Sequence, residues 1–131
     1  MLPSFHDGYL TGLAVSEGAA TLSFLRSDGA RWRVDLSGVR YLKADEFRQG
    51  NIVFALEVVS DAEESRALLE AHHYPLGATA AQGVRDALVD REINLLVDQI
   101  ALDALVLVSL SASYGCEMIV VCKTAEGKEV G

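Results

Sequence analysis

Apolar and polar side chains alternate at every position along residues 30–36. One set is Trp32, Val34 and Leu36, and the other is Arg31, Arg33 and Asp35. Successive side chains of a β-strand point to opposite faces, so this segment predicts a strand with one face in the core and one in water. Such a strand belongs to an antiparallel sheet, and the rest of the fold has to supply the layer that covers its apolar face.

Further strands are predicted around it, which makes residues 8–59 rich in β-structure. The expected strands are 9–16, 20–27, 39–42 and 51–59. Asp28-Gly29 is a strong hairpin signal before residue 30. Residues 51–59 place Ile52, Phe54 and Val58 on one face with Leu56, and carry a single charge, Glu57. This pattern predicts a central strand covered on both sides.

The hydrophobic period changes after residue 59, and residues 60–92 are predicted to be helical. Ser60 followed by Glu63 fits a capping box, and the first helix should end near residues 72–73. Thr79 offers a second cap for a helix that reaches about residue 90. Residues 93–103 fit a helix and a short strand equally well, and a break is expected near residues 91–92.

The last third is predicted to return to β-structure over residues 104–123, with residues 124–131 as a frayed tail. We therefore expect one α+β domain over residues 1–131. A mainly antiparallel sheet of six to seven strands should carry one or two helices on one face. The predicted core consists of Leu13, Val15, Leu22, Phe24, Trp32, Val34, Ile52, Phe54, Leu56, Leu69, Leu88, Val106, Val108, Ile119 and Val121.

The formal net charge of −8 is concentrated in the second half of the chain. Residues 1–59 carry six basic and seven acidic side chains, whereas residues 60–131 carry five and twelve. A nucleic-acid partner is not expected, because binding phosphates needs a surplus of Lys and Arg. The acidity either keeps the domain in solution or attracts a basic protein.

Composition also bears on compartment and membrane. Cys116 and Cys122 are six positions apart on a predicted strand, about 20 Å and too far for a disulfide. Two free thiols fit the cytoplasm. Residues 104–122 are apolar, but three serines, Gly115 and Glu117 interrupt them, so two buried strands are expected rather than a membrane span.

Few residues are candidates for chemistry. His72 and His73 are adjacent, so from a regular helix they point about 100° apart and cannot bind one metal together. His6-Asp7 has no accompanying nucleophile motif. We name no catalytic residue and no metal ligand, and we expect no cofactor. Phe47, flanked by charges of both signs in residues 43–51, is a candidate interface anchor unless it folds back onto the core.

Three stretches, FHDGYLTGL, LSGVRYLKADEFRQGNIVFALEV and SYGCEMIVVC, resemble small, mostly uncharacterised bacterial α+β domains. Some similar domains are immunity proteins that neutralise secreted toxins. The resemblance covers about half of the chain and includes no catalytic signature. It implies a bacterial protein that binds a partner and is not an enzyme.

Three hypotheses follow for the function. The leading one is a protein-binding module whose acidic helical half contacts a partner, with Glu63, Glu64, Glu70, Phe47, His72 and His73 as candidate binding residues. The second is a small enzyme or ligand-binding domain in which His6, His72 or His73 meets carboxylates in one pocket. The third is a structural homo-oligomer, such as a homodimer formed through a leftover strand edge.

Overall fold

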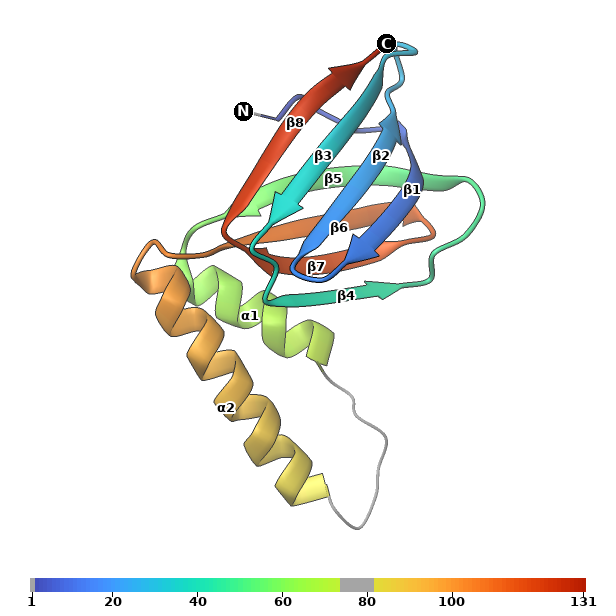
Figure 1. The fold of residues 1–131 in the computed structure, drawn as a ribbon. Helices are drawn as coiled ribbons and strands as arrows, with labels where there is room; N and C mark the ends of the chain where they lie inside the picture. Colours follow the sequence, from blue (N-terminus) through green and yellow to red (C-terminus); the bar gives the residue numbers. More distant parts are fainter. Residues whose placement is uncertain (1, 74–81) are drawn as a thin grey trace.

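The computed structural model describes residues 2–73 and 82–131, and the side chains of residues 73 and 82–88 lie outside that description. Within these residues the fold is α+β, an eight-strand antiparallel sheet with two helices (Figure 1). The elements are β1 (Tyr9–Ser16), β2 (Ala19–Leu25), β3 (Arg31–Ser37), β4 (Tyr41–Asp45), β5 (Asn51–Val59), α1 (Ala62–His73), α2 (Gln82–Ala101), β6 (Val106–Tyr114), β7 (Glu117–Cys122) and β8 (Thr124–Val130). The predicted fold class is confirmed.

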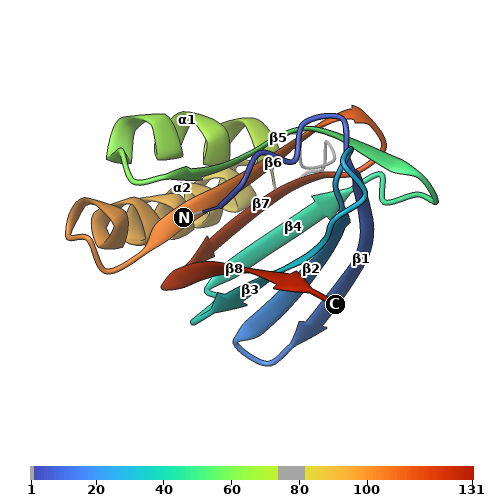
Figure 2. The same cartoon turned by 90° about the horizontal axis from the view of Figure 1, so that it is seen from above.

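The sheet order is β4-β7-β6-β5-β1-β2-β3-β8. β4 follows β3 after three residues, and β8 follows β7 after Lys123 alone. At this junction the Arg40 N–H donates to the Val121 carbonyl (2.8 Å) and the Lys123 N–H donates to the Ser37 carbonyl (2.9 Å). The sheet therefore folds into two halves, one of β5, β6, β7 and β4 and one of β1, β2, β3 and β8, that face each other (Figure 2).

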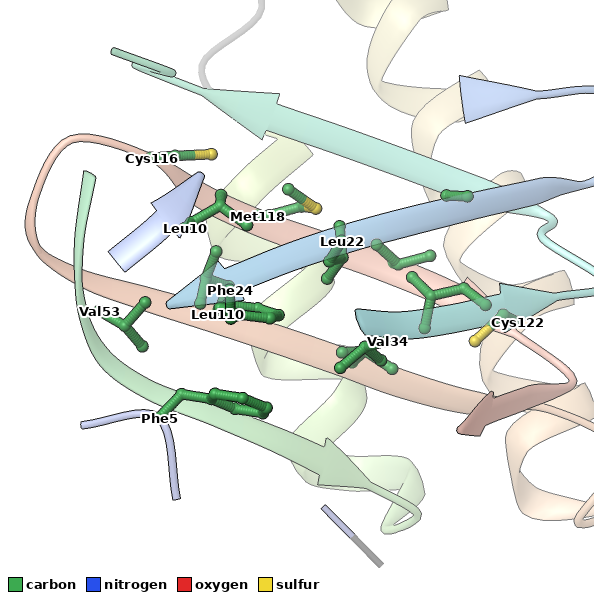
Figure 3. Packing of buried hydrophobic residues seen from close by; sticks show 14 residues of the cluster. Phe5, Leu10, Leu22, Phe24, Val34, Val53, Leu110, Cys116, Met118 and Cys122 are labelled. Carbon is green, nitrogen blue, oxygen red and sulfur yellow. The ribbon is translucent and has the colours of Figure 1, made fainter. Parts of the chain in front are cut away.

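The larger hydrophobic core lies between the two halves of the sheet. Leu22, Phe24 and Val34 from one half meet Leu110 and Met118 from the other (Figure 3). The alternation predicted for β3 is confirmed, because Val34 and Leu36 are buried whereas Arg31 and Arg33 are exposed. Burial of apolar area between two facing half-sheets is the main stabilising contribution here.

The two helices cover the outer face of the β5–β7 half and enclose a second core (Figure 2). Its apolar stripe on α2 consists of Val89, Ile93, Leu96, Val97 and Ile100. Residues 93–101 are therefore helical, and the break predicted near residues 91–92 is wrong. The helix continues because this stripe faces the sheet without interruption, packing on Leu107, Ile119 and Val121.

Asp61, not Ser60, caps the first helix. α1 begins at Ala62, and the Asp61 side chain accepts a hydrogen bond from the Glu64 N–H (2.8 Å). At the other end of α1, the Lys43 ammonium donates to the His72 carbonyl. A cation suits the negative end of the helix dipole. The second predicted cap, Thr79, lies outside the described residues.

The C-terminal tail is not frayed. Residues Thr124–Val130 form β8 and pair with all seven residues of β3. This strand raises the number of strands above the six or seven expected. Its polar sequence reflects its position at the edge of the sheet, where the side chains stay mostly in solvent.

Most predicted core positions are buried or partly buried, but Val15 and Phe54 are exposed. Val15 lies at the end of β1, beside the turn to β2.

On β5 the pairing with β6 is irregular between Ile52 and Ala55, so the alternation changes phase and Val53 is buried in place of Phe54. Phe54, Glu57 and Val58 leave β5 open to solvent, which contradicts the expected cover on both sides. Leu88 lies outside the described side chains.

Both cysteines are free and buried. Burial raises the pKa of each thiol to about 11, with the Asp45 carboxylate as a further cause for Cys116. No helix in the described part of the chain is long and apolar enough to cross a membrane.

Candidate functional site

A row of side chains crosses six neighbouring strands on the outside of the sheet. Its members, partnered strand by strand, are Tyr114, Ile52, Tyr9, Leu25, Arg31 and Val130. We call this set the outer row. Directly paired residues of antiparallel strands share a face, and every member is exposed or partly exposed. The row thus forms a continuous, largely apolar band on the surface.

The helices leave the outer row uncovered. On β5 they pack over Val59, whereas Ile52 lies seven residues away, about 23 Å along the strand. Tyr9 and Tyr114 keep 44% and 49% of their area in solvent. Ile52 lies between the two tyrosines in the row. Exposed aromatic side chains grouped on one surface are a feature of interaction sites.

A hollow of about 470 Å³ lies beside the outer row. Tyr9, Leu10 and Thr11 of β1 form one wall, and residues 47–50 of the turn between β4 and β5 form the other. Phe47 in this turn is 48% exposed, so it does not fold back onto the core. The side chains lining the hollow are mainly apolar or uncharged, and Arg48 is the one charged residue among them.

A buried asparagine, Asn51, fixes the shape of this site. Its Oδ1 accepts hydrogen bonds from the N–H groups of Arg48 (2.8 Å) and Cys116 (3.0 Å). Its Nδ2 donates to the carbonyls of Leu10 (3.2 Å) and Arg48. One side chain therefore ties β1, the Phe47 turn and the hairpin between β6 and β7 together. A Cβ at Gly115, which has φ of +89°, would collide with Asn51 Oδ1, so this hairpin requires glycine.

Arg48 supplies the charge of the site. Its guanidinium carbon lies 5.7 Å from the centre of the Tyr114 ring, within the range of a cation–π interaction. It also donates to the Glu46 carboxylate, and that hydrogen bond raises the pKa of Arg48. The Arg48 guanidinium lies over the Tyr114 ring, so the orientation of this ring is set before a partner binds.

The structure brings only Phe47 of the predicted binding residues to this site. Glu63, Glu64 and Glu70 are exposed on α1, on the helical layer. His72 is partly buried near the end of α1, where its carbonyl accepts the Lys43 hydrogen bond. The side chain of His73 lies outside the described part. Among the described residues, no hydrogen bond, ion pair or pocket joins Phe47 to these positions.

The histidines do not converge. His6 lies against the edge of β5, where its Nδ1 is 2.8 Å from the Phe54 carbonyl and its ring meets the Phe54 ring edge to face. His72 is on α1, where its carbonyl meets Lys43 of β4, and two strands, β7 and β6, lie between β4 and β5 in the sheet. Within residues 2–73 and 82–131, no three His, Cys, Asp or Glu side chains are placed to hold a metal ion.

Sequence reasoning missed Tyr9, Tyr114 and Arg48. The two tyrosines lie in predicted strands, where aromatic residues are common for packing reasons alone. The position of Tyr9 after Gly8 and of Tyr114 before Gly115 could have indicated exposure, because aromatic residues at strand ends lie at the margin of a sheet. Cross-strand register, which a single sequence does not show, is what brings them together.

The chain matches no protein-family model, no curated protein and no solved structure.

Proposed function

We propose that the chain is a non-enzymatic protein-binding module whose contact surface is the outer row together with the Phe47 turn. The observation that carries this proposal is the exposure of three aromatic side chains. Tyr9 and Phe47 line a hollow of about 470 Å³, and Tyr114 lies against Arg48, which lines the same hollow. Tyr and Arg are the residue types that dominate binding energy at protein interfaces.

The energetics favour a partner that inserts an apolar side chain into the hollow. Each aromatic ring offers about 150–250 Å² of contact area at a low cost in side-chain entropy. The strand positions and the Asn51 hydrogen bonds hold the walls in place. A preorganised surface loses less entropy when it binds, so a few anchors suffice for a specific complex.

Variants of the aromatic residues test this proposal. Proteins retained by the immobilised chain are identified, and the affinity of each purified partner is then measured by calorimetry. Tyr9→Ala and Phe47→Ala should each weaken binding at least tenfold, about 1.4 kcal/mol or more. Leu102→Ala is the matched control, because Leu102 on the helical side is 73% exposed and lies outside the site. A partner whose affinity is unchanged by both Tyr9→Ala and Phe47→Ala would contradict the proposal.

The acidic helical layer is a second candidate surface for the same class of function. Residues 60–103 carry nine acidic and three basic side chains, and Glu63, Glu64 and Glu70 are exposed there. The negative electrostatic potential of these residues would attract a basic protein and raise its association rate. Reversing these three charges to Lys should then slow association and remove its dependence on salt. An unchanged association rate would leave the outer row as the binding surface.

A further inference from the structure

β5 separates from β1 soon after the two strands meet. Their pairing consists of Tyr9 with Ile52 and Leu10 with Asn51, followed by hydrogen bonds between Val53 and residues 7 and 8. Beyond Phe54, β5 is paired with β6 on one side only. Residues 55–59 therefore form a free strand edge in the described structure.

A turn at residues 5–8 takes the N-terminal chain out of the sheet and leaves this edge vacant. The Gly8 N–H donates to the Phe5 carbonyl (2.9 Å), and Asp7 has φ of +62°. Phe5 then enters the core, where its ring stacks on Phe24 at 4.3 Å between centres (Figure 3). A hollow of about 440 Å³ separates residues 2–6 from residues 54–57 of β5.

The vacant edge keeps its capacity for hydrogen bonds. In an antiparallel ladder every second residue directs its N–H and C=O away from its partner strand. The Phe54 carbonyl is met by the ring of the exposed His6 rather than by a backbone group. Among the described residues, no backbone group pairs with residues 55–59 on the side away from β6.

The free edge of β5 is less protected than that of β8, one of the two strands that end the sheet order. β8 has charged side chains at Glu126, Lys128 and Glu129, and charges of this kind discourage pairing with another strand. Residues 54–59 of β5 carry one charge, Glu57, while Phe54 and Val58 expose 56% and 47% of their area. Residues 54–59 thus combine free backbone groups, two exposed apolar side chains and an adjoining hollow of about 440 Å³ with a single charge.

We propose that an extended segment of a partner protein adds to β5 as a further strand along residues 54–59. Backbone hydrogen bonds to this edge would provide the affinity, as in other cases of strand addition. Phe54 and Val58 select apolar side chains at alternate positions of the segment. Glu57 selects a basic residue on the other face of the added segment, because opposite charges across paired strands are favourable.

Charge favours a partner segment over a second copy of this chain. A two-fold pairing of two β5 edges would bring two Glu57 carboxylates together. Residues 54–59 offer no basic side chain to balance them. Like charges across paired strands are destabilising. The site therefore fits a basic, apolar strand from a different protein.

A labelled peptide tests the proposal directly. The probe is Val-Thr-Val-Lys-Val-Thr-Val, with its valines on one face and its lysine on the other. Fluorescence anisotropy of the full chain should give saturable binding, and hydrogen exchange should slow at amides within residues 54–59. The same peptide with alternate backbone nitrogens methylated should bind at least tenfold more weakly, since it lacks the donors that a strand uses.

Matched variants distinguish strand addition from nonspecific hydrophobic binding of the peptide. Val58→Lys should weaken binding about tenfold, whereas Leu102→Lys, at an even more exposed apolar residue just after α2, should not. Glu57→Lys should weaken binding of the lysine peptide and strengthen that of a version with glutamate in its place. The proposal is overturned by absent binding, by equal binding of the methylated peptide, by protection at β8 instead of β5, or by a dimer that Val58→Lys dissociates.

Discussion

Asn51 is the residue on which both the fold and the proposed surface depend. It is fully buried, and its amide satisfies backbone groups in three segments that are distant in sequence. Asn51→Ala leaves the Cys116 N–H and the Leu10 carbonyl without these partners. We expect a loss of about 3 kcal/mol in the free energy of unfolding, because buried polar groups that lose their hydrogen bonds are costly.

Chemical denaturation of Asn51→Ala beside Asn94→Ala measures this effect. Asn94 is exposed on α2 and accepts one hydrogen bond from Arg66 (2.9 Å). Its removal should cost less than about 0.5 kcal/mol. Equal losses for the two variants would show that the buried amide has no special role.

Single residues also mark where sequence reasoning succeeds and fails. Phe47 could be chosen as an interface anchor, because an aromatic flanked by charges in a loop has no strand pattern to explain it. Phe54 was misplaced, since the irregular pairing near Val53 reverses the two faces of β5 and leaves no mark in the sequence. The outer row could not be predicted, because it exists only through the register of six strands.

At the scale of elements, the start of α1 distinguishes two capping arrangements. The structure assigns the cap to Asp61, whose carboxylate accepts from the Glu64 N–H, whereas the sequence favoured Ser60. Asp61→Ala should lower the free energy of unfolding by about 1 kcal/mol. Ser60→Ala should leave it nearly unchanged. The reverse order in thermal unfolding would restore the capping box at Ser60.

β8 supplies a second prediction at this scale. It pairs with β3 along seven residues, and its Ala125 packs against the core. Removing residues 124–131 should lower the melting temperature by about 10 °C or more, since several hydrogen bonds of about 1 kcal/mol each are lost. Removing Gly131 alone leaves the ladder intact and should have no effect. A truncated chain that melts like the full one would mean that β8 contributes nothing.

The elements that sequence predicted well are those with one clear period. β1 and β5 were predicted with the bounds that the structure gives, because turn residues flank regular apolar runs. β8 was missed, since an edge strand with solvated side chains has the composition of a tail. α2 was divided in error, because the apolar positions of residues 84–88 in the sequence are out of phase with those of residues 93–100. Only the packing of residues 89–100 on the sheet shows that the helix continues.

For the whole molecule, the three layers place different chemistry on different surfaces. The helices carry most of the surplus acid on one side of the sheet, while Arg31 and Arg48 accompany the aromatic band of the outer row. Between these surfaces the fold favours the neutral forms of the Cys116 and Cys122 thiols and of the Tyr41 phenol. Burial raises the pKa of Tyr41 to about 12, and the carboxylates of Glu92 and Asp45 act in the same direction.

These raised pKa values predict a loss of stability in alkali. Cys116 and Cys122 ionise near pH 9 when unfolded and near 11 when folded, and Tyr41 near 10 and 12. Between those values the folded chain holds more protons than the unfolded chain, so the free energy of unfolding falls as pH rises. The stabilisation is complete below pH 9 and is lost toward pH 12, by at most about 1.4 kcal/mol per pH unit for each group.

Urea denaturation at steps from pH 8 to 11 measures this slope. Replacing both cysteines by alanine should lower stability at pH 8, because buried volume is lost, yet it should flatten the decline between pH 9 and 10. Tyr41→Phe should instead flatten the decline above pH 10. If the parent and the cysteine variant fall with the same slope between pH 9 and 10, the thiols are not held neutral by the fold, and the close packing inferred between the two half-sheets would have to admit water.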